Sequence, residues 1–476
     1  MMSQIDLAPA RAAREGAPLF TCPSVWGVSP EKPILFRIPL LGERPMRVTA
    51  RHLPEGVQLD EERGILTGSA AQGEYAVRLR AENRLGAAEK TLVLRVEPDG
   101  ALRTPLLGFT SWNAYANTVT QDKILESARI MDESGLADFG YQYVNIDSCW
   151  QGRYWGGKID AIQPNEKFPD MKGLIDAIHA LGLKVGIYST PMQKAWGDEN
   201  LPGCTRGRLD PAYAQTYFGV GEEHMEAQNA QQWAEWGVDY LKYDWSPCDV
   251  KNAELMKKAL LSQNRDIPLC VTVHAGKEHA DWWKNNCCSW RDNGDSNSEW
   301  PNVLTRFESD DWAAHIMPGH YFDQDMLETG VTVWHENRLT EDEQLIAYSI
   351  RAMFPSPIQI SCDLTRLTEF DRALLMNEEV IAVNQDELSV GAVCIEEKTT
   401  RKADRSVERR LKVYARPLEN GDMAICAFNL GEVAETVAQP AKRARDLWAK
   451  KDLSIENGCV TVTLPPHTVR MLRLSR

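Results

Sequence analysis

Residues 223–244, EHMEAQNAQQWAEWGVDYLKYD, contain a helical run that leads directly into a short apolar strand. The helical part spans 223–237. The strand, 238–244, is rich in the aromatic and aliphatic residues that favour β-structure. Helices and strands that alternate in this way are typical of α/β proteins built on a parallel sheet.

The same alternation continues on both sides of this stretch. Further helical runs occupy 121–135, 171–182 and 342–354, and further strands are predicted at 106–112, 141–147, 183–189, 268–274, 287–292, 320–326 and 357–363. Eight strands within about 280 residues predict a (β/α)8 TIM barrel. The alternative is a doubly wound open sheet, which usually has fewer strands and often a glycine-rich first turn. The GxGxxG motif of such a turn is absent.

Antiparallel β-structure is predicted on either side of the barrel. YAVRLRAEN (75–83) and KTLVLRVEP (90–98) alternate apolar and polar residues, and Asn420-Gly421 is a good hairpin turn. The first β-region contains no aromatic row, which favours packing against the barrel over carbohydrate binding. We assign a loose N-terminal arm to 1–20, a small β-sandwich to 21–100, the barrel to 101–388 and an antiparallel β-sandwich domain to 389–476.

Composition restricts the partners and the compartment. Lys and Arg number 53 against 68 Asp and Glu, and a net charge of −15 without a basic run disfavours nucleic acid and anionic membranes. No apolar run approaches the roughly 18 residues of a membrane span, and the first residues lack the pattern of a secretory signal. We expect a cytoplasmic protein, or a secreted one if a signal has been removed. Eleven cysteines without a CxxC pair predict reduced thiols and no zinc site.

Functional side chains of a TIM barrel lie at the carboxyl ends of its strands. Polar or aromatic residues occupy these ends throughout: Trp112-Asn113, Asp147-Ser148, Tyr188-Ser189, Lys242 and Asp244, His274, Arg291 and Asp295, Asp323 and Asp325, and Asp363. A single aspartate at such a position could cap a following helix. At least five carboxylates on one rim cannot all be caps, which predicts an acidic active site.

Two pairs within this set favour glycosidic cleavage, which needs carboxyl groups on opposite sides of a sugar. Lys242 and Asp244 are two residues apart on one strand, so both point into the barrel, and the ammonium favours the ionised carboxylate of a nucleophile. Asp295 follows Arg291 beyond a strand end. It must hold a proton to act as an acid, so we expect it in a less polarised environment than Asp244. The alternative for Lys242 and Asp244 is a buried ion pair that holds the barrel mouth, and the alternative for Asp295 is a solvated loop aspartate.

A divalent-metal hydrolase is the other use of an acidic rim. Such enzymes usually supply histidine ligands. Among nine histidines only His274 lies at a strand end, and neither HxH nor HExxH occurs. We therefore expect neither a metal nor a cofactor.

Residues 105–476 resemble glycoside hydrolase family 27, the α-galactosidase and α-N-acetylgalactosaminidase family, strand by strand and in order. WGVDYLKYDW (236–245) carries its K-Y-D motif, and FPDMKGLIDAIHALGLKVGIYS (168–189) matches its segment almost throughout. The other similar pairs are GFTSWNAY and GWNSWN, YVNIDSCW and YVNIDDCW, SWRDNGD and WRTTGD, YFDQDML and WNDPDML, and PIQISCDL and PLxxSNDL. Residues 53–96 resemble immunoglobulin-like domains appended to bacterial glycosidases.

The resemblance implies a role for each site residue. Asp244 would be the nucleophile of a retaining enzyme and Asp295 its acid/base. Trp112 would line the sugar pocket, with Tyr188 nearby. The residues that hold the sugar hydroxyls would be Asp147, Lys242, Arg291 and Asp325. Family members have a disulfide between the loops after strands 3 and 4, which leaves a Cys204–Cys248 bond open here.

Three departures concern the sugar-binding residues. Ser148 replaces the second aspartate of a pair that binds the C4–C6 side of galactose, and a hydroxyl makes weaker bonds than a carboxylate. His274 lies in VHAG where the family has CEWG, on the C2 side of the sugar. Tyr321-Phe322 replace Trp-Asn. Ser148 and His274 remain candidate substrate-binding residues.

These features predict a retaining hydrolase that removes a terminal α-galactosyl-type residue from an oligosaccharide or other glycoside. One alternative is the same chemistry on a β-L-arabinopyranoside, an α-N-acetylgalactosaminide or an α-glucoside. The other is a sugar-binding barrel without catalysis, against which the retention of Asp244 and Asp295 argues. No oligomeric state is predicted.

Overall fold

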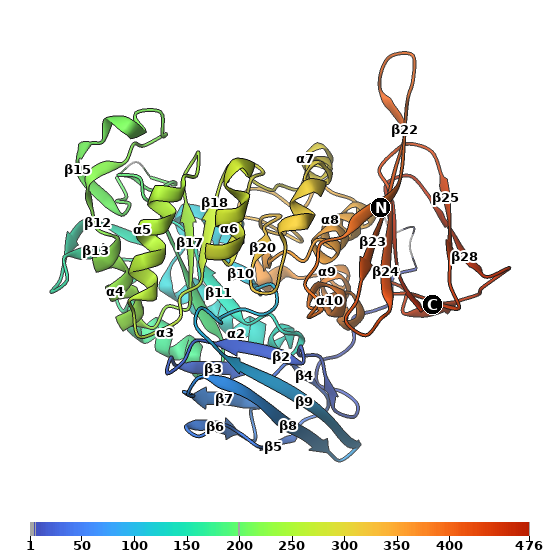
Figure 1. Ribbon diagram of the computed structural model, residues 1–476, viewed down its shortest axis with the longest axis horizontal. Helices are drawn as coiled ribbons and strands as arrows, with labels where there is room; N and C mark the ends of the chain where they lie inside the picture. Colours follow the sequence, from blue (N-terminus) through green and yellow to red (C-terminus); the bar gives the residue numbers. More distant parts are fainter. Residues whose placement is uncertain (1–3, 5, 199, 476) are drawn as a thin grey trace.

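The computed structural model describes residues 4, 6–198 and 200–475 and has a barrel flanked by two β-domains (Figure 1). The N-terminal sandwich, blue in Figure 1, lies below the barrel, and the C-terminal β-domain, red, lies at its side. The predicted fold class, a TIM barrel with two β-domains, is confirmed.

The barrel is one parallel sheet with a strand at every predicted position. In chain order the strands are β10 (Leu107–Thr110), β11 (Tyr143–Ile146), β14 (Lys184–Ser189), β17 (Tyr240–Asp244), β18 (Leu269–Thr272), β19 (Ser289–Trp290), β20 (Tyr321–Phe322) and β21 (Ile358–Ile360). Neighbours in this order are paired from β10 to β20, and β21 pairs with β10. The ring closes just beyond β20, where Leu327 N donates to Gln359 O (2.8 Å) and Ser361 N donates to Leu327 O (2.9 Å). This closure excludes an open doubly wound sheet.

Helices cover the outside of the barrel (Figure 1). The four predicted helical runs correspond to α2 (Gln121–Glu133), α3 (Met171–Ala180), α4 (Glu226–Trp236) and α8 (Glu341–Met353). Gly237 ends α4 with a φ of +100°, a conformation that glycine adopts without strain, so that β17 can begin three residues later. No helix in the described part of the chain is long and apolar enough to cross a membrane. The other α-helices of the described residues are α1 (Trp112–Tyr115), α5 (Val250–Leu261), α6 (Ala280–Asn286), α7 (Trp300–Thr305), α9 (Glu369–Leu375) and α10 (Glu378–Asn384).

Two antiparallel hairpins lengthen the loops that follow the second and third barrel strands. One pairs β12 (Gln151–Gly156) with β13 (Ala161–Pro164), and the other pairs β15 (Thr205–Leu209) with β16 (Gly221–His224). Because these loops leave the carboxyl ends of the strands, the hairpins enlarge the rim where barrel active sites lie.

The N-terminal sandwich has two sheets around its own core. One sheet has the order β2 (Val25–Val28), β9 (Gly86–Val96), β8 (Gly73–Asn83) and β5 (Arg47–Arg51), and the other has β3 (Ile34–Arg37), β7 (Ile65–Gly68) and β6 (Val57–Asp60). The alternation seen in the sequence buries Val77 and Leu79 of β8 against Leu92 and Leu94 of β9 in this core. A separate short antiparallel pair joins β1 (Leu19–Phe20) to β4 (Leu40–Leu41).

The N-terminal arm is bound to two other parts of the molecule, so the expectation of a loose segment is wrong for its described residues. Ala8 N donates to Trp448 O (3.0 Å) in the C-terminal domain. Arg14 Nε lies 3.3 Å from Asp138 Oδ2 in the barrel. The arm therefore connects the first, second and last parts of the chain.

Asp138 also forms ion pairs with two arginines of the N-terminal sandwich. Arg37 Nη2 lies 2.8 Å from Asp138 Oδ1, and Arg44 Nη2 lies 3.5 Å from the same oxygen. Asp138 and Arg37 are both buried, and a buried charge is tolerated only when it is paired. With Arg14, three arginines from the first 44 residues converge on one barrel carboxylate.

The C-terminal domain is an antiparallel sandwich, as predicted. Its larger sheet has the order β22 (Val393–Arg401), β23 (Val407–Pro417), β24 (Met423–Asn429), β29 (Thr468–Ser475), β26 (Arg443–Asp446) and β27 (Lys451–Leu453), and β25 (Glu435–Pro440) pairs with β28 (Cys459–Leu464). The predicted Asn420-Gly421 turn joins β23 to β24. Gly421 has a φ of +85°, and its N–H donates to Leu418 O (3.0 Å).

All eleven cysteines are free thiols. Cys204 Sγ lies 3.1 Å from Ser189 Oγ, and Cys248 Sγ lies 3.4 Å from Trp245 O. The disulfide that the family resemblance left open is therefore not formed.

Candidate active site

A cavity of about 590 Å³ opens at the carboxyl ends of the barrel strands. Its volume is in the range of small-molecule binding sites. The predicted residues Arg291 and Asp325 do not line the cavity. Arg291 forms ion pairs with Asp295, which does line it, and with Asp325. The predicted site residues that line the cavity are Trp112, Asp147, Tyr188, Lys242, Asp244, His274 and Asp295.

Lys242 and Asp147 form a buried ion pair on the cavity floor. Lys242 Nζ lies 2.8 Å from Asp147 Oδ2, which also accepts a bond from Thr110 Oγ1 (3.3 Å). Burial alone would lower the pKa of Lys242. The carboxylates of Asp147, Asp244 and Asp325 outweigh it and hold that pKa above its usual range. Lys242 is therefore a permanent cation, ready to bind a sugar hydroxyl together with Asp147.

Asp244, the last residue of β17, is a buried carboxyl. The pKa of Asp244 is raised to about 7, chiefly by burial, which Lys242 and Arg291 only partly offset. The carboxylates of Asp295 and Asp147 contribute to the increase. The expectation that Lys242 keeps Asp244 ionised is therefore wrong below neutral pH, because desolvation outweighs the attraction of the ammonium.

Aromatic residues form two walls of the cavity. Burial, followed by the carboxylates of Asp244 and Asp147, raises the pKa of Tyr188 far above its usual range, so its hydroxyl stays protonated and can donate. Trp112 is half-buried in α1. Its ring meets the exposed Trp334 edge to face, with 6.1 Å between ring centroids.

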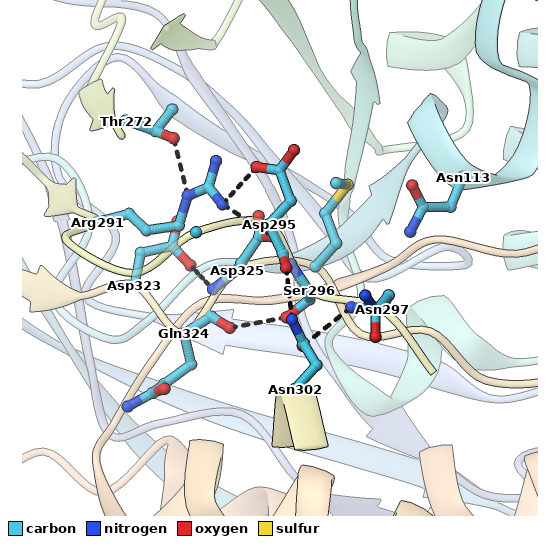
Figure 2. A network of polar contacts seen from close by, with 12 residues as sticks. Asn113, Thr272, Arg291, Asp295, Ser296, Asn297, Asn302, Asp323, Gln324 and Asp325 are labelled. Carbon is cyan, nitrogen blue, oxygen red and sulfur yellow. Dashed lines mark hydrogen bonds and ion pairs between the residues drawn. The ribbon is translucent and has the colours of Figure 1, made fainter. Parts of the chain in front are cut away.

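Arg291 connects two carboxylates at this rim, as Figure 2 shows. Its Nη1 lies 2.8 Å from Asp295 Oδ1 and 3.0 Å from Asp325 Oδ2. Its Nε donates to Thr272 Oγ1 (2.8 Å), which fixes the plane of the guanidinium. A planar cation held at both ends sets the position of Asp295 relative to Asp325.

Asp295 is mostly exposed, in contrast to Asp244. Its side chain retains 72% of its accessible surface. Asn302 Nδ2 donates to the Asp295 carbonyl (2.9 Å), and Ser296 N donates to Asp325 Oδ2 (2.6 Å), so the loop is held from both sides. The predicted contrast is therefore reversed. Asp244 has the less polar environment, and Asp295 faces solvent and a guanidinium because it lies beyond the strand end.

The pKa values of Asp323 and Asp325 are shifted in opposite directions. Burial raises the pKa of Asp325, but Arg291, Lys242 and Arg306 outweigh it and lower that pKa. Burial and the charge of Asp325 raise the pKa of Asp323 instead, and its Oδ1 accepts a bond from Asp325 N (2.7 Å).

Among the residues described, no group of three His, Cys, Asp or Glu side chains is arranged to hold a metal ion.

Known protein families account for both the barrel and the C-terminal domain. The family described as alpha galactosidase A matches residues 110–386, and the alpha galactosidase C-terminal beta sandwich domain matches residues 408–474. The chain belongs to the α-galactosidase family. The predicted family is thereby confirmed, and the protein is a glycoside hydrolase.

Three relatives illustrate the similarity. An α-galactosidase of Oryza sativa subsp. japonica is 30% identical over 430 residues, which are 86% of this chain and 93% of the relative. A solved structure from Bacteroides fragilis NCTC 9343, provisionally assigned as an α-galactosidase/melibiase, has a TM-score of 0.86 at 29% identity and covers 98% of this chain and 99% of that chain. The GH27 β-L-arabinopyranosidase of Geobacillus stearothermophilus has a TM-score of 0.66 at 25% identity and covers 79% and 97% of the two chains.

Two departures of this glycoside hydrolase from its family have different structural meanings. Ser148 is buried, and its hydroxyl donates to the Trp196 carbonyl, so this predicted binding residue does not line the cavity. His274 is exposed and does line it, with Nδ1 2.7 Å from Ser246 Oγ. Of the two, only His274 can contact the sugar directly.

Other strand-end features of the hydrolase are structural. The Tyr321 hydroxyl donates to Arg103 O (2.8 Å), and the Phe322 ring stacks on Trp312 with 5.2 Å between centroids. This third departure therefore lies in the barrel wall. Asp363 caps a short 3-10 turn, the role considered for a single strand-end aspartate.

Sequence reasoning missed much of the cavity rim. Further lining residues include Trp196, Gln215 and Tyr217 from the loop after β14, Ser246 and Pro247 from the loop after β17, and Met326. The long segment between β14 and α4, with a tryptophan and neighbouring aromatic residues, was the signal that could have found the first group.

Proposed function

We propose that the enzyme removes a terminal α-D-galactosyl residue by double displacement, with Asp244 as nucleophile and Asp295 as acid/base. The observation that carries the proposal is that both carboxyls line one cavity in opposite environments. Asp244 is buried at its floor and Asp295 is exposed at its rim. Retaining glycosidases need one carboxylate against the anomeric carbon and one carboxyl at the glycosidic oxygen.

The first half-reaction uses these environments. The Asp244 carboxylate attacks the anomeric carbon while Asp295 donates its proton to the glycosidic oxygen. The bond between that carbon and oxygen breaks, and the aglycone leaves. Formation of the ester removes a buried negative charge, so the desolvation that raises the pKa of Asp244 also favours its attack. Arg291 contacts Oδ1 of Asp295, which leaves Oδ2 to carry the proton.

In the second half-reaction Asp295 takes a proton from a water molecule, which attacks the same carbon and releases Asp244. Two inversions at one carbon retain the configuration. Exposure of Asp295 gives water access to it once the aglycone has left.

Galactose is the preferred sugar because relatives that align with most of the chain are α-galactosidases. A β-L-arabinopyranoside is a second candidate. It has the ring of an α-galactoside without the hydroxymethyl group. The Ser148 hydroxyl, which stands where the family binds that side of the sugar, is turned to the Trp196 carbonyl. A GH27 relative of similar fold is a β-L-arabinopyranosidase.

The test compares wild type with Asp244→Ala on an α-galactoside and on a β-L-arabinopyranoside. We expect wild type to prefer the α-galactoside and to release product of retained configuration. Asp244→Ala should lower turnover by about 10³-fold or more, and azide should restore it and give the inverted glycosyl azide.

Three results would contradict parts of the proposal. An unchanged rate in Asp244→Ala would show that Asp244 is not the nucleophile. A product of inverted configuration would exclude double displacement. Cleavage of the arabinopyranoside alone would replace galactose by the second candidate.

A further inference from the structure

We propose that His467 of the C-terminal domain is a positioning residue for Asp295, and that it acts through Trp300, the first residue of α7. The inference rests on the proposed function, because Asp295 is assigned there as the acid/base. None of the described residues of the C-terminal domain lines the catalytic cavity, so this domain can affect the reaction only through residues that it holds in place.

The short helix α7 contacts the Asp295 loop on one side and the C-terminal domain, beside which it lies in Figure 1, on another. Asn302, its third residue, donates from Nδ2 to the Asp295 carbonyl (2.9 Å). Trp300, its first, stacks on the imidazole of His467, with 4.4 Å between the ring centroids and 25° between the ring planes. Residues two apart on a helix point in different directions, so one helix can make both contacts. A shift of its first turn therefore moves the donor that holds Asp295.

The segment that follows α7 is also fixed to the C-terminal domain. The ring of Phe307 meets that of Phe428 edge to face, with 4.9 Å between centroids. The Tyr414 hydroxyl donates to Asp310 Oδ1 (2.7 Å). The same domain therefore holds both ends of the segment that carries Asn302.

His467 reaches α7 from a strained turn between β28 and β29. Its φ is +53°, in the left-handed region that residues other than glycine rarely adopt. The carbonyl of Pro465, two residues earlier, accepts bonds from Asn429 Nδ2 (2.8 Å) and Thr468 Oγ1 (2.7 Å), which fix the turn. A strained conformation persists only when its surroundings determine it, and such residues are concentrated at positions with a function.

Both ring nitrogens of His467 face carboxylates. Nδ1 lies 2.7 Å from Glu343 Oε1 in α8, and Nε2 lies 3.3 Å from Glu432 Oε1 in the loop between β24 and β25. Only the imidazolium can donate from both nitrogens. The hydrogen bond to Glu343 and the charges of the two carboxylates raise the pKa of His467, although burial opposes them. An imidazolium over the indole of Trp300 adds a cation–π attraction to the stack.

The position of Asp295 depends on such contacts because packing does not fix it. Its side chain retains 72% of its accessible surface, so the polar contacts of its loop and of Arg291 determine where its proton is presented. Loss of the stack would let the start of α7 move, and the Asp295 loop with it. The step that suffers is the one that needs this proton, the protonation of the glycosidic oxygen.

The experiment compares methyl α-galactoside, whose leaving group needs a proton, with α-galactosyl fluoride, whose fluoride ion leaves without one. His467→Ala should lower kcat about 3- to 10-fold for the methyl glycoside, with little change in KM, and should leave the fluoride nearly unchanged. Both rates are measured on one preparation, so a loss of folded enzyme cancels in their ratio. If His467→Ala does not fold, the milder His467→Gln, which loses the ring and keeps a donor toward Glu343, gives the same ratio.

Two further variants test whether the effect passes through α7. Trp300→Ala should change the ratio as His467→Ala does, and Trp300→Phe, which keeps a ring for the stack, should change it less. In the background of Asn302→Ala, which already releases the Asp295 carbonyl, His467→Ala should have no further effect on the ratio.

Arg445→Ala is the matched control for a lost contact between domains. Arg445 also joins the C-terminal domain to the barrel, with Nη2 2.6 Å from Glu379 Oε1 in α10, but it does not contact α7. This variant should leave the ratio of the two rates as in wild type.

Three results would overturn the inference while the proposed function stands. They are an unchanged ratio in the His467 variants, an effect of His467→Ala that adds fully to that of Asn302→Ala, and a ratio changed equally by Arg445→Ala. The proposed function fails separately. If Asp295→Ala itself does not favour the fluoride over the methyl glycoside, Asp295 is not the acid and this inference falls with that role.

Discussion

Asn302 donates a 2.9 Å hydrogen bond from Nδ2 to the backbone carbonyl of Asp295. Its Oδ1 accepts from Asn297 N (3.1 Å), so one side chain of α7 fastens both arms of the turn after Asp295. Arg306 Nη2 donates to the Gly294 carbonyl (2.9 Å) on the other side of Asp295. The proposed acid/base is thus positioned by a helix whose own side chains do not line the cavity.

We expect Asn302→Ala to lower kcat/KM about tenfold for substrates with a sugar leaving group, because a misplaced acid protonates the leaving oxygen poorly. The fluoride ion leaves without protonation, so α-galactosyl fluoride should be hydrolysed at nearly the wild-type rate. Parallel kinetics on the two substrates check this. An equal loss on both would mean that Asn302 only supports the fold.

The pH profile of kcat/KM for the fluoride should reflect Asp244 alone. Its pKa of about 7 means that the reactive carboxylate is present above neutral pH and is protonated below it. We expect kcat/KM to be level above pH 7 and to fall about tenfold per pH unit below it. A profile that stays level down to pH 5 would refute this assignment.

Asp295→Asn provides the matched variant for the pH experiment. The Asp295 carboxylate raises the pKa of Asp244, so its removal should move the acidic limb for the fluoride to lower pH. A shift to higher pH would show that another group governs the limb.

Asp244→Asn should stabilise the protein while it abolishes turnover. The folded-state pKa of Asp244, about 7, is above the ordinary value of 3.8, so folding binds a proton and the carboxyl costs stability increasingly from about pH 4 to pH 7. Asn resembles the protonated form and removes that cost. We expect the free energy of unfolding at pH 8 to rise by about 1–4 kcal/mol, with little change near pH 4. Denaturant unfolding at both pH values tests this, and equal effects at both would contradict it.

Ser148→Asp restores the residue type that the family has at this position, yet it should not improve galactoside binding. The Ser148 hydroxyl donates to the Trp196 carbonyl, and a carboxylate there would face that carbonyl without a proton to donate. We expect a loss of about 1–3 kcal/mol in unfolding free energy and no decrease in KM for an α-galactoside. Ser148→Ala is the control, and a lower KM in Ser148→Asp would show that the loop rearranges to present the carboxylate.

The positions of the proposed catalytic residues could be predicted because they depend on local patterns. Lys242 and Asp244 share a face through the period of a strand, and strand ends meet at one end of any TIM barrel. The closed ring followed from the number of strands. These features need no knowledge of which distant segments touch.

The protonation and the contacts of the same residues depend on distant segments. The pKa of Asp244 is set by depth of burial, and no local pattern encodes depth. Ser148 is turned away by the carbonyl of Trp196, 48 residues later. Trp196 and Tyr217 reach the cavity from the segment after β14, and irregular loops have no periodicity to recognise.

The three arginines that converge on Asp138 give the first 44 residues a part in the folding of the barrel. An enzyme truncated to begin at residue 101 would retain every proposed catalytic group and the entire eight-stranded ring. It would also retain a buried carboxylate stripped of all three counter-ions, a defect of the kind that costs several kcal/mol. We therefore expect the first 44 residues to add to the stability of the barrel, so that the smallest stably folded unit of the hydrolase is larger than its catalytic domain.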